Sequence, residues 1–90
     1  MNLQDILYKV SIDKVVGSTD IEISNIAFDS RKVNVNGLFV AINGTISDGH
    51  QFIDSTIEKG AVAIIVEQIP ANINEEITYI KVENSNDALG

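Results

Sequence analysis

The sequence predicts a small α/β domain in which a mixed, largely parallel β-sheet is flanked by helices. The runs Leu38–Ile42 and Ala61–Glu67 are continuously apolar, which is typical of strands buried on both faces. Between them, residues 50–59 carry apolar side chains at helical spacing, and Gly60 follows where a left-handed residue ends a helix. This strand–helix–strand order predicts a βαβ unit, with parallel strands joined by a right-handed crossover.

Shorter patterns predict the remaining elements. Residues 2–10 show one apolar stripe of helical period, with Asn2 as the expected N-cap. Residues 20–28 alternate in short apolar and polar steps and predict a strand. The Asn36-Gly37 pair indicates a tight turn before the first apolar run, and Ile77–Val82 indicates a further strand.

The chain length and one helix-start pattern predict how the chain is divided into domains. Ninety residues suffice for one small domain, which we expect to occupy residues 1–83. The run Asn84–Asp87 is typical of a helix N-cap, but few residues follow it. We therefore expect residues 84–90 to begin the connection to another domain of a longer protein.

Composition excludes several classes of function. Six basic residues against thirteen acidic ones give a net charge of −7, which argues against nucleic-acid binding. Without cysteine and with one histidine, the chain has neither a disulfide framework nor a predicted metal site. It shows no signal-peptide pattern and no apolar run near the ~20 residues that span a bilayer. We therefore expect a cytoplasmic protein that does not engage a membrane.

A glycine-bearing loop follows the first apolar run. Gly44 and Gly49 have the spacing of a phosphate-binding P-loop between a strand and a helix. His50 replaces the lysine of that motif, and Gln51 replaces its magnesium-binding hydroxyl. The loss of both chemically active positions argues against nucleotide hydrolysis by this loop. An ordinary strand–helix turn and an anion site at backbone N–H groups both remain open, and the spacing alone favours the first.

A second polar cluster, Asp29-Ser30-Arg31, follows the predicted 20–28 strand. If that strand is parallel to the first apolar run, the cluster and the glycine loop share one edge of the sheet, where α/β folds bind ligands. The Ser30 hydroxyl would then position a ligand. Arg31 would either bind a phosphate or form a salt bridge with a neighbouring aspartate, and the residues alone leave both open.

Several short motifs follow one another in a fixed order along the chain, namely Phe28-Asp29-Ser30-Arg31-Lys32-Val33, Leu38-Phe39-Val40-Ala41, Gly44, Asp48-Gly49-His50, Phe52-Ile53 and Gly60-Ala61. Taken together, these motifs resemble the N-terminal domain of the Mur ligases, the ATP-dependent amide-bond ligases of bacterial peptidoglycan synthesis. The MurE type, which adds the third stem-peptide residue, is the most similar, and the MurF type is the alternative. MurF more often has threonine in place of Ser30 and an aromatic residue before Asp48.

The resemblance implies that this chain binds the uridine diphosphate (UDP) portion of UDP-MurNAc-L-Ala-D-Glu. It implies that ATP, magnesium and the catalytic residues belong to the central domain, and that the third domain recognises the amino acid added. This chain would then need no cofactor, would contain no catalytic residue, and would have that substrate and those two domains as partners. The implied contacts are Phe28, Ser30, Thr45, Ile46 and Ser47, with support from Asp29, Arg31, Asp48 and His50.

Two other classes of function stay open. A free-standing acidic α/β interaction module would explain the charge and the small size. A hydrolase would need a triad of Ser30, His50 and Asp29 or Asp48, but no G-x-S-x-G elbow surrounds the serine.

Overall fold

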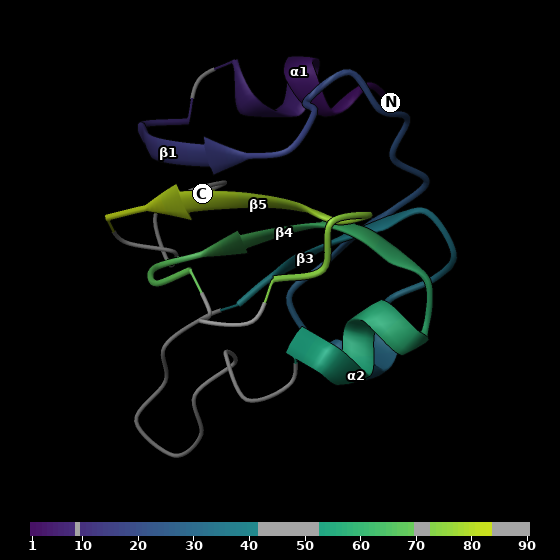
Figure 1. Cartoon of the computed structure of the whole chain (residues 1–90). Helices are drawn as coiled ribbons and strands as arrows, with labels where there is room; N and C mark the ends of the chain where they lie inside the picture. The colour runs from purple at the N-terminus through teal and green to yellow at the C-terminus, as the bar shows by residue number, and fades with distance from the viewer. Residues whose placement is uncertain (9, 42–52, 70–72, 84–90) are drawn as a thin grey trace.

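The computed structural model describes residues 1–8, 10–41, 53–69 and 73–83. Within them, one five-stranded sheet has the order β1-β5-β4-β3-β2 (Figure 1). Neighbouring strands from β2 to β5 run parallel, and β1 runs antiparallel to β5. The mixed α/β sheet is therefore confirmed. Its strands are β1 (Ile12–Val16), β2 (Ile26–Ala27), β3 (Gly37–Val40), β4 (Ala61–Val66) and β5 (Thr78–Val82).

Helices α1 (Leu3–Leu7) and α2 (Ile53–Glu58) lie on opposite sides of the sheet (Figure 1). The order β3, α2, β4 with parallel strands confirms the predicted βαβ unit. Gly60 ends the connection with a φ of +109°, as its position after the helix predicts. A short 3₁₀ helix, η1 (Ser30–Lys32), follows β2 and packs beside α2.

The central strands β3, β4 and β5 are buried on both faces, to which successive residues of a strand point in turn. On β3, Phe39 faces the α2 side, while Leu38 and Val40 face the α1 side. The α2-side cluster contains Ala27, Val33, Phe39, Ala41, Ile53, Ala61, Ile64, Val66, Ile77 and Tyr79. The α1-side cluster contains Leu3, Leu7, Ile23, Leu38, Val40, Ala63, Ile65, Ile80 and Val82.

The N-terminal helix is shorter than its apolar stripe predicts. Asn2 is the N-cap, because its Oδ1 accepts a hydrogen bond from the Gln4 amide at 2.9 Å. The helix ends at Leu7, although the partly buried Val10 still packs against the α1-side cluster. The apolar stripe therefore identified the buried side chains correctly but overestimated the length of the helix.

Strand β1 was not predicted from the sequence. Its first residues are exposed and include the polar pair Asp13-Lys14, so they lack an apolar face. Pairing with β5 creates the strand, with Val15 opposite Ile80 and a register shift after Ile12. Long-range pairing outweighed a weak local pattern here.

The predicted 20–28 strand is also mostly wrong, because regular pairing with β3 is confined to β2. The earlier part of this segment pairs with the N-terminus. The Leu3 amide donates to the Ile21 carbonyl at 2.8 Å, and the Ile23 amide donates to the Met1 carbonyl at 2.6 Å.

Candidate functional site

The carboxyl ends of β2 and β3 meet at one edge of the sheet. The two strands are parallel, and Ala27 lies opposite Phe39. Phe28 therefore leaves β2 at the same edge where the chain leaves β3, as the sequence predicts. The aromatic side chain of Phe28 is 53% exposed, although it directly follows a buried strand. Five of the predicted site residues lie outside the described residues, namely Thr45, Ile46, Ser47, Asp48 and His50.

After Phe28 the backbone turns, and residues 28–32 are named here the 28–32 turn. Asp29 caps η1, because its Oδ1 accepts a hydrogen bond from the Arg31 amide at 2.9 Å. The Arg31 guanidinium binds the same carboxylate twice, with Nε at 3.1 Å from Oδ1 and Nη2 at 2.8 Å from Oδ2. These contacts hold Asp29 and Arg31 together over one turn.

This pairing shifts the pKa of both ionisable groups. The side-chain and backbone hydrogen bonds from Arg31 lower the pKa of Asp29 from 3.8 to about 2. The Asp29 carboxylate raises the pKa of Arg31. The structure thus shows the salt bridge that the sequence left open, while the arginine side chain stays 83% exposed. A phosphate contact by Arg31 stays a prediction.

Ser30 is partly buried, and its carbonyl accepts a hydrogen bond from Lys59 Nζ at 3.0 Å. Its hydroxyl makes no hydrogen bond to the described residues. In the sequence, Lys59 is only the last residue of the helix predicted over residues 50–59. Its contact with Ser30 was missed, because nothing local connects residues so far apart in sequence.

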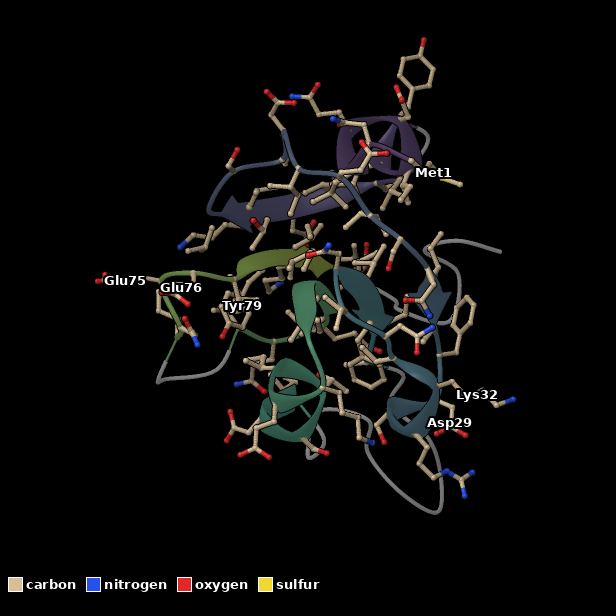
Figure 2. All side chains as sticks on the ribbon, turned by 90° about the vertical axis from the view of Figure 1, so that its right-hand side faces the viewer. Met1, Asp29, Lys32, Glu75, Glu76 and Tyr79 are labelled. Atoms are coloured by element: carbon tan, nitrogen blue, oxygen red, sulfur yellow. The ribbon has the colours of Figure 1, made fainter. Side chains whose placement is uncertain are left out.

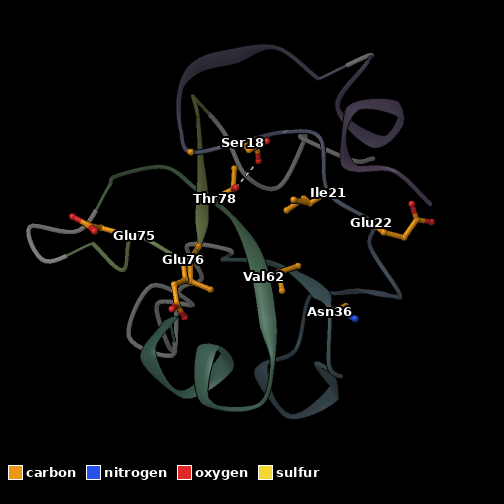
Figure 3. A pocket seen from close by; sticks show the side chains of 10 residues that line it. Ser18, Ile21, Glu22, Asn36, Val62, Glu75, Glu76 and Thr78 are labelled. Carbon is orange, nitrogen blue, oxygen red and sulfur yellow. Dashed lines mark hydrogen bonds between the residues drawn. The ribbon is translucent and has the colours of Figure 1, made fainter.

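A pocket of about 420 Å³ opens at the other end of the sheet, between the segment after β1 and the starts of β4 and β5 (Figure 3). Thr78 Oγ1 donates to the Ser18 carbonyl at 2.6 Å across one wall. Glutamates contribute the only charges among its described lining residues, so this pocket does not suit an anionic ligand. It is lined by Gly17, Ser18, Ile21, Glu22, Asn36, Val62, Glu75, Glu76, Ile77 and Thr78.

Figure 2 shows that the two regions are well separated, with Asp29 and Lys32 on one side and Glu75 and Glu76 on the other. In the described part of the chain, no group of acidic, histidine or cysteine residues could hold a metal ion. No described helix is long and apolar enough to cross a membrane.

A family model described as "Mur ligase family, catalytic domain" matches residues 22–90. The chain belongs to the Mur ligase family. Among its Mur ligase relatives, the UDP-N-acetylmuramoyl-L-alanyl-D-glutamate–2,6-diaminopimelate ligase of Bacteroides fragilis is 46% identical over 90 residues, and that of Clostridium tetani is 44% identical over 91. The chain spans 19% of the length of each, about a fifth of a full Mur ligase.

Solved Mur ligase structures share the fold. MurF from Acinetobacter baumannii matches 97% of this chain and 18% of its own, with a TM-score of 0.67 and 26% identity. MurF from Thermotoga maritima, solved in complex with ADP, matches 70% of this chain and 14% of its own, with a TM-score of 0.60 and 36% identity. The sequence relatives are thus of the MurE type, and these structural neighbours are of the MurF type.

Proposed function

We propose that this chain is the N-terminal, UDP-binding domain of a MurE-type ligase. In this role it holds the UDP portion of UDP-MurNAc-L-Ala-D-Glu between the 28–32 turn and the loop that follows β3. The complete cytoplasmic enzyme then uses ATP and magnesium, bound by its other domains, to add the third amino acid of the peptidoglycan precursor. The 90-residue chain binds substrate but does not catalyse.

The observation that carries the proposal is the exposed Phe28 at the shared carboxyl edge of β2 and β3. An aromatic face can stack on a nucleobase, an interaction worth about 1–3 kcal/mol. Ser30 lies two residues further on, with a hydroxyl that no described residue engages. Base stacking next to a hydroxyl that makes no hydrogen bond to the described residues suits a nucleotide better than the glutamate-lined pocket does.

Charge constrains how the diphosphate is held. The chain has a net charge of −7, so its overall field repels an anion. Backbone N–H groups can bind phosphate oxygens without net charge. In this proposal such N–H groups make most of the phosphate contacts, and Arg31, already paired with Asp29, makes a secondary one.

Titration of the chain with UDP, followed by NMR and calorimetry, tests the proposal. Phe28→Ala and Ser30→Ala should weaken UDP binding, the serine variant by about 0.5–1.5 kcal/mol, the worth of one hydrogen bond. Tyr8→Ala and Ser11→Ala are matched controls, since both residues are exposed and distant in sequence from the turn. Unchanged affinity in both site variants, or shifts confined to the glutamate-lined pocket, would contradict this site.

Two further readouts separate the alternatives. The gene downstream of residue 90 should encode a P-loop with its lysine, as the ATP-dependent role requires. The MurF alternative predicts that the complete enzyme acts on a substrate already carrying three amino acids. A free-standing acidic module predicts no response to UDP at all.

A further inference from the structure

One peptide group in the 28–32 turn is held from both ends. The carbonyl of Ser30 and the N–H of Arg31 belong to the same planar unit. Lys59 Nζ donates to that carbonyl at 3.0 Å, and Asp29 Oδ1 accepts from that N–H at 2.9 Å. A cation and an anion thus bind the two ends of one peptide dipole.

The lysine reaches this peptide from a firmly held backbone. The Lys59 amide donates to the carbonyls of Ser55 at 3.2 Å and Thr56 at 3.1 Å, which continues the α2 hydrogen-bond pattern. Thr56 is fully buried, and its hydroxyl donates to the Ile53 carbonyl at 2.8 Å. The hydrogen bond from Lys59 therefore ties the turn after β2 to the end of α2, 29 residues away in sequence.

We propose that Lys59 is a positioning residue of the nucleotide site, acting through the Ser30–Arg31 peptide; this inference rests on the proposed function. Fixing the plane of that peptide restricts ψ of Ser30, and with it the direction of the Cα–Cβ bond that carries the hydroxyl. A turn ordered before the ligand arrives loses less conformational entropy on binding. Lys59 therefore raises affinity without touching the ligand.

A competing explanation is simple charge attraction between Lys59 and the diphosphate. Two probes separate the explanations, because uridine carries the base and ribose of UDP without its phosphates. In the proposed site the Ser30 hydroxyl contacts the base or ribose beside Phe28. Loss of positioning therefore weakens binding of both probes, whereas loss of charge attraction weakens binding of UDP alone. Lys32 supplies the matched variant, since it is an exposed cation of the same turn whose side chain makes no hydrogen bond to the described residues.

The experiment measures UDP and uridine affinities of the chain and of four variants by NMR titration. Lys59→Met should weaken binding of both probes by about three- to tenfold, and Lys59→Arg should restore most of the loss. Lys32→Met should weaken binding of UDP only. Lys81→Met, which removes a lysine paired with Asp13 at 3.1 Å on the far edge strand, should change neither.

Spectroscopy supplies a readout of the contact itself. The carbonyl ¹³C shift of Ser30 and the amide ¹⁵N shift of Arg31 should move in Lys59→Met and return in Lys59→Arg. Neither should move in Lys81→Met. Thermal unfolding of each variant checks that the fold is kept, as expected for an exposed side chain such as Lys59.

The outcomes distinguish the two proposals. If wild type binds UDP and Lys59→Met binds uridine as tightly as wild type does, the positioning role is overturned while the proposed function stands. A loss in Lys59→Met limited to UDP and equal to that in Lys32→Met would also overturn it, in favour of charge attraction. If wild type binds neither probe, the proposed function fails, and this inference fails with it.

Discussion

The 28–32 turn and the glutamate-lined pocket are the two candidate ligand sites discussed for the described chain, and they differ in shape and charge. The pocket has a volume of about 420 Å³ and a rim that includes Glu22, Glu75 and Glu76. The turn presents an exposed aromatic ring and an ordered peptide. For an anionic nucleotide, charge and stacking outweigh concavity, because glutamates repel phosphate whatever the shape of the pocket.

The two regions are also attached to the same buried sheet. Strands β3, β4 and β5 are buried, and the pocket lies at their amino ends, while the turn follows the neighbouring β2. Damage to the core should therefore affect both regions together, whereas local changes should affect one at a time.

The largest expected effect comes from Phe39→Ala in β3. Phe39 is 1% exposed within the α2-side cluster, and truncation of a buried phenylalanine costs about 3–5 kcal/mol. That loss is a large part of the stability of a small domain, so both regions should lose their structure together. Urea unfolding monitored by circular dichroism measures the loss.

Tyr8→Ala is the control for that change, since its aromatic ring is 84% exposed and should cost little. Should Phe39→Ala prevent folding, Ile64→Val in the same cluster should still show a cost of about 0.5–1.5 kcal/mol. Equal unfolding midpoints for Ile64→Val and wild type would show that the shared core does not support the two regions.

A smaller effect should follow from Gly60→Ala, just before β4. Its φ of +109° is strained for any residue with a Cβ, and that Cβ would lie 2.6 Å from the Val35 Cα. We expect a loss of about 1–3 kcal/mol in the free energy of unfolding. Gly17→Ala, beside the pocket, is the comparison, since its Cβ would lie 3.0 Å from Thr78 Oγ1 and no closer than 3.2 Å to any backbone atom, the Thr78 Cα.

Thermal unfolding of the two glycine variants ranks these sites. The strain of positive φ is common to both, so the difference between them reports the closer backbone contact at Val35, 2.6 Å against 3.2 Å. A Gly60→Ala protein as stable as wild type would mean that the connection between α2 and β4 adapts freely.

The smallest expected effect concerns the ion pair between Asp29 and Arg31 in the 28–32 turn. Asp29 should titrate near pH 2 when its carboxyl ¹³C shift is followed by NMR. Because the folded-state pKa lies below the ordinary value of 3.8, the ion pair stabilises the fold above that value and is lost as pH falls through about 2. The pairing is therefore complete at neutral pH.

Arg31→Ala should raise the pKa of Asp29 part of the way back toward its ordinary value, since the backbone N–H of residue 31 still donates. Lys32→Ala should raise it far less, because Lys32 acts only through its charge. Equal shifts in the two variants would contradict the two-contact pairing of Asp29 with Arg31.

Sequence patterns predicted the elements whose burial is decided locally. The runs that became β3 and β4 are apolar throughout, and the Asn2 cap and Gly60 turn rely on near neighbours. Sequence patterns did not predict β1, because its polar Asp13-Lys14 pair interrupts the apolar alternation of a strand. For the site, the motif order pointed to Phe28 and Ser30, but the dependence of Ser30 on Lys59 had no local signal.

By itself, the sequence determined the βαβ unit and the family, since hydrophobic period and ordered motifs are properties of the chain. The pair of loops proposed to contact a nucleotide stays a prediction. Only the tertiary structure decided that Arg31 pairs with Asp29, that β1 joins the sheet, and that Lys59 holds the Ser30 carbonyl. The physical reason is that these contacts depend on distance in space. A lysine 29 residues from its acceptor becomes its neighbour only when the helix packs beside the turn.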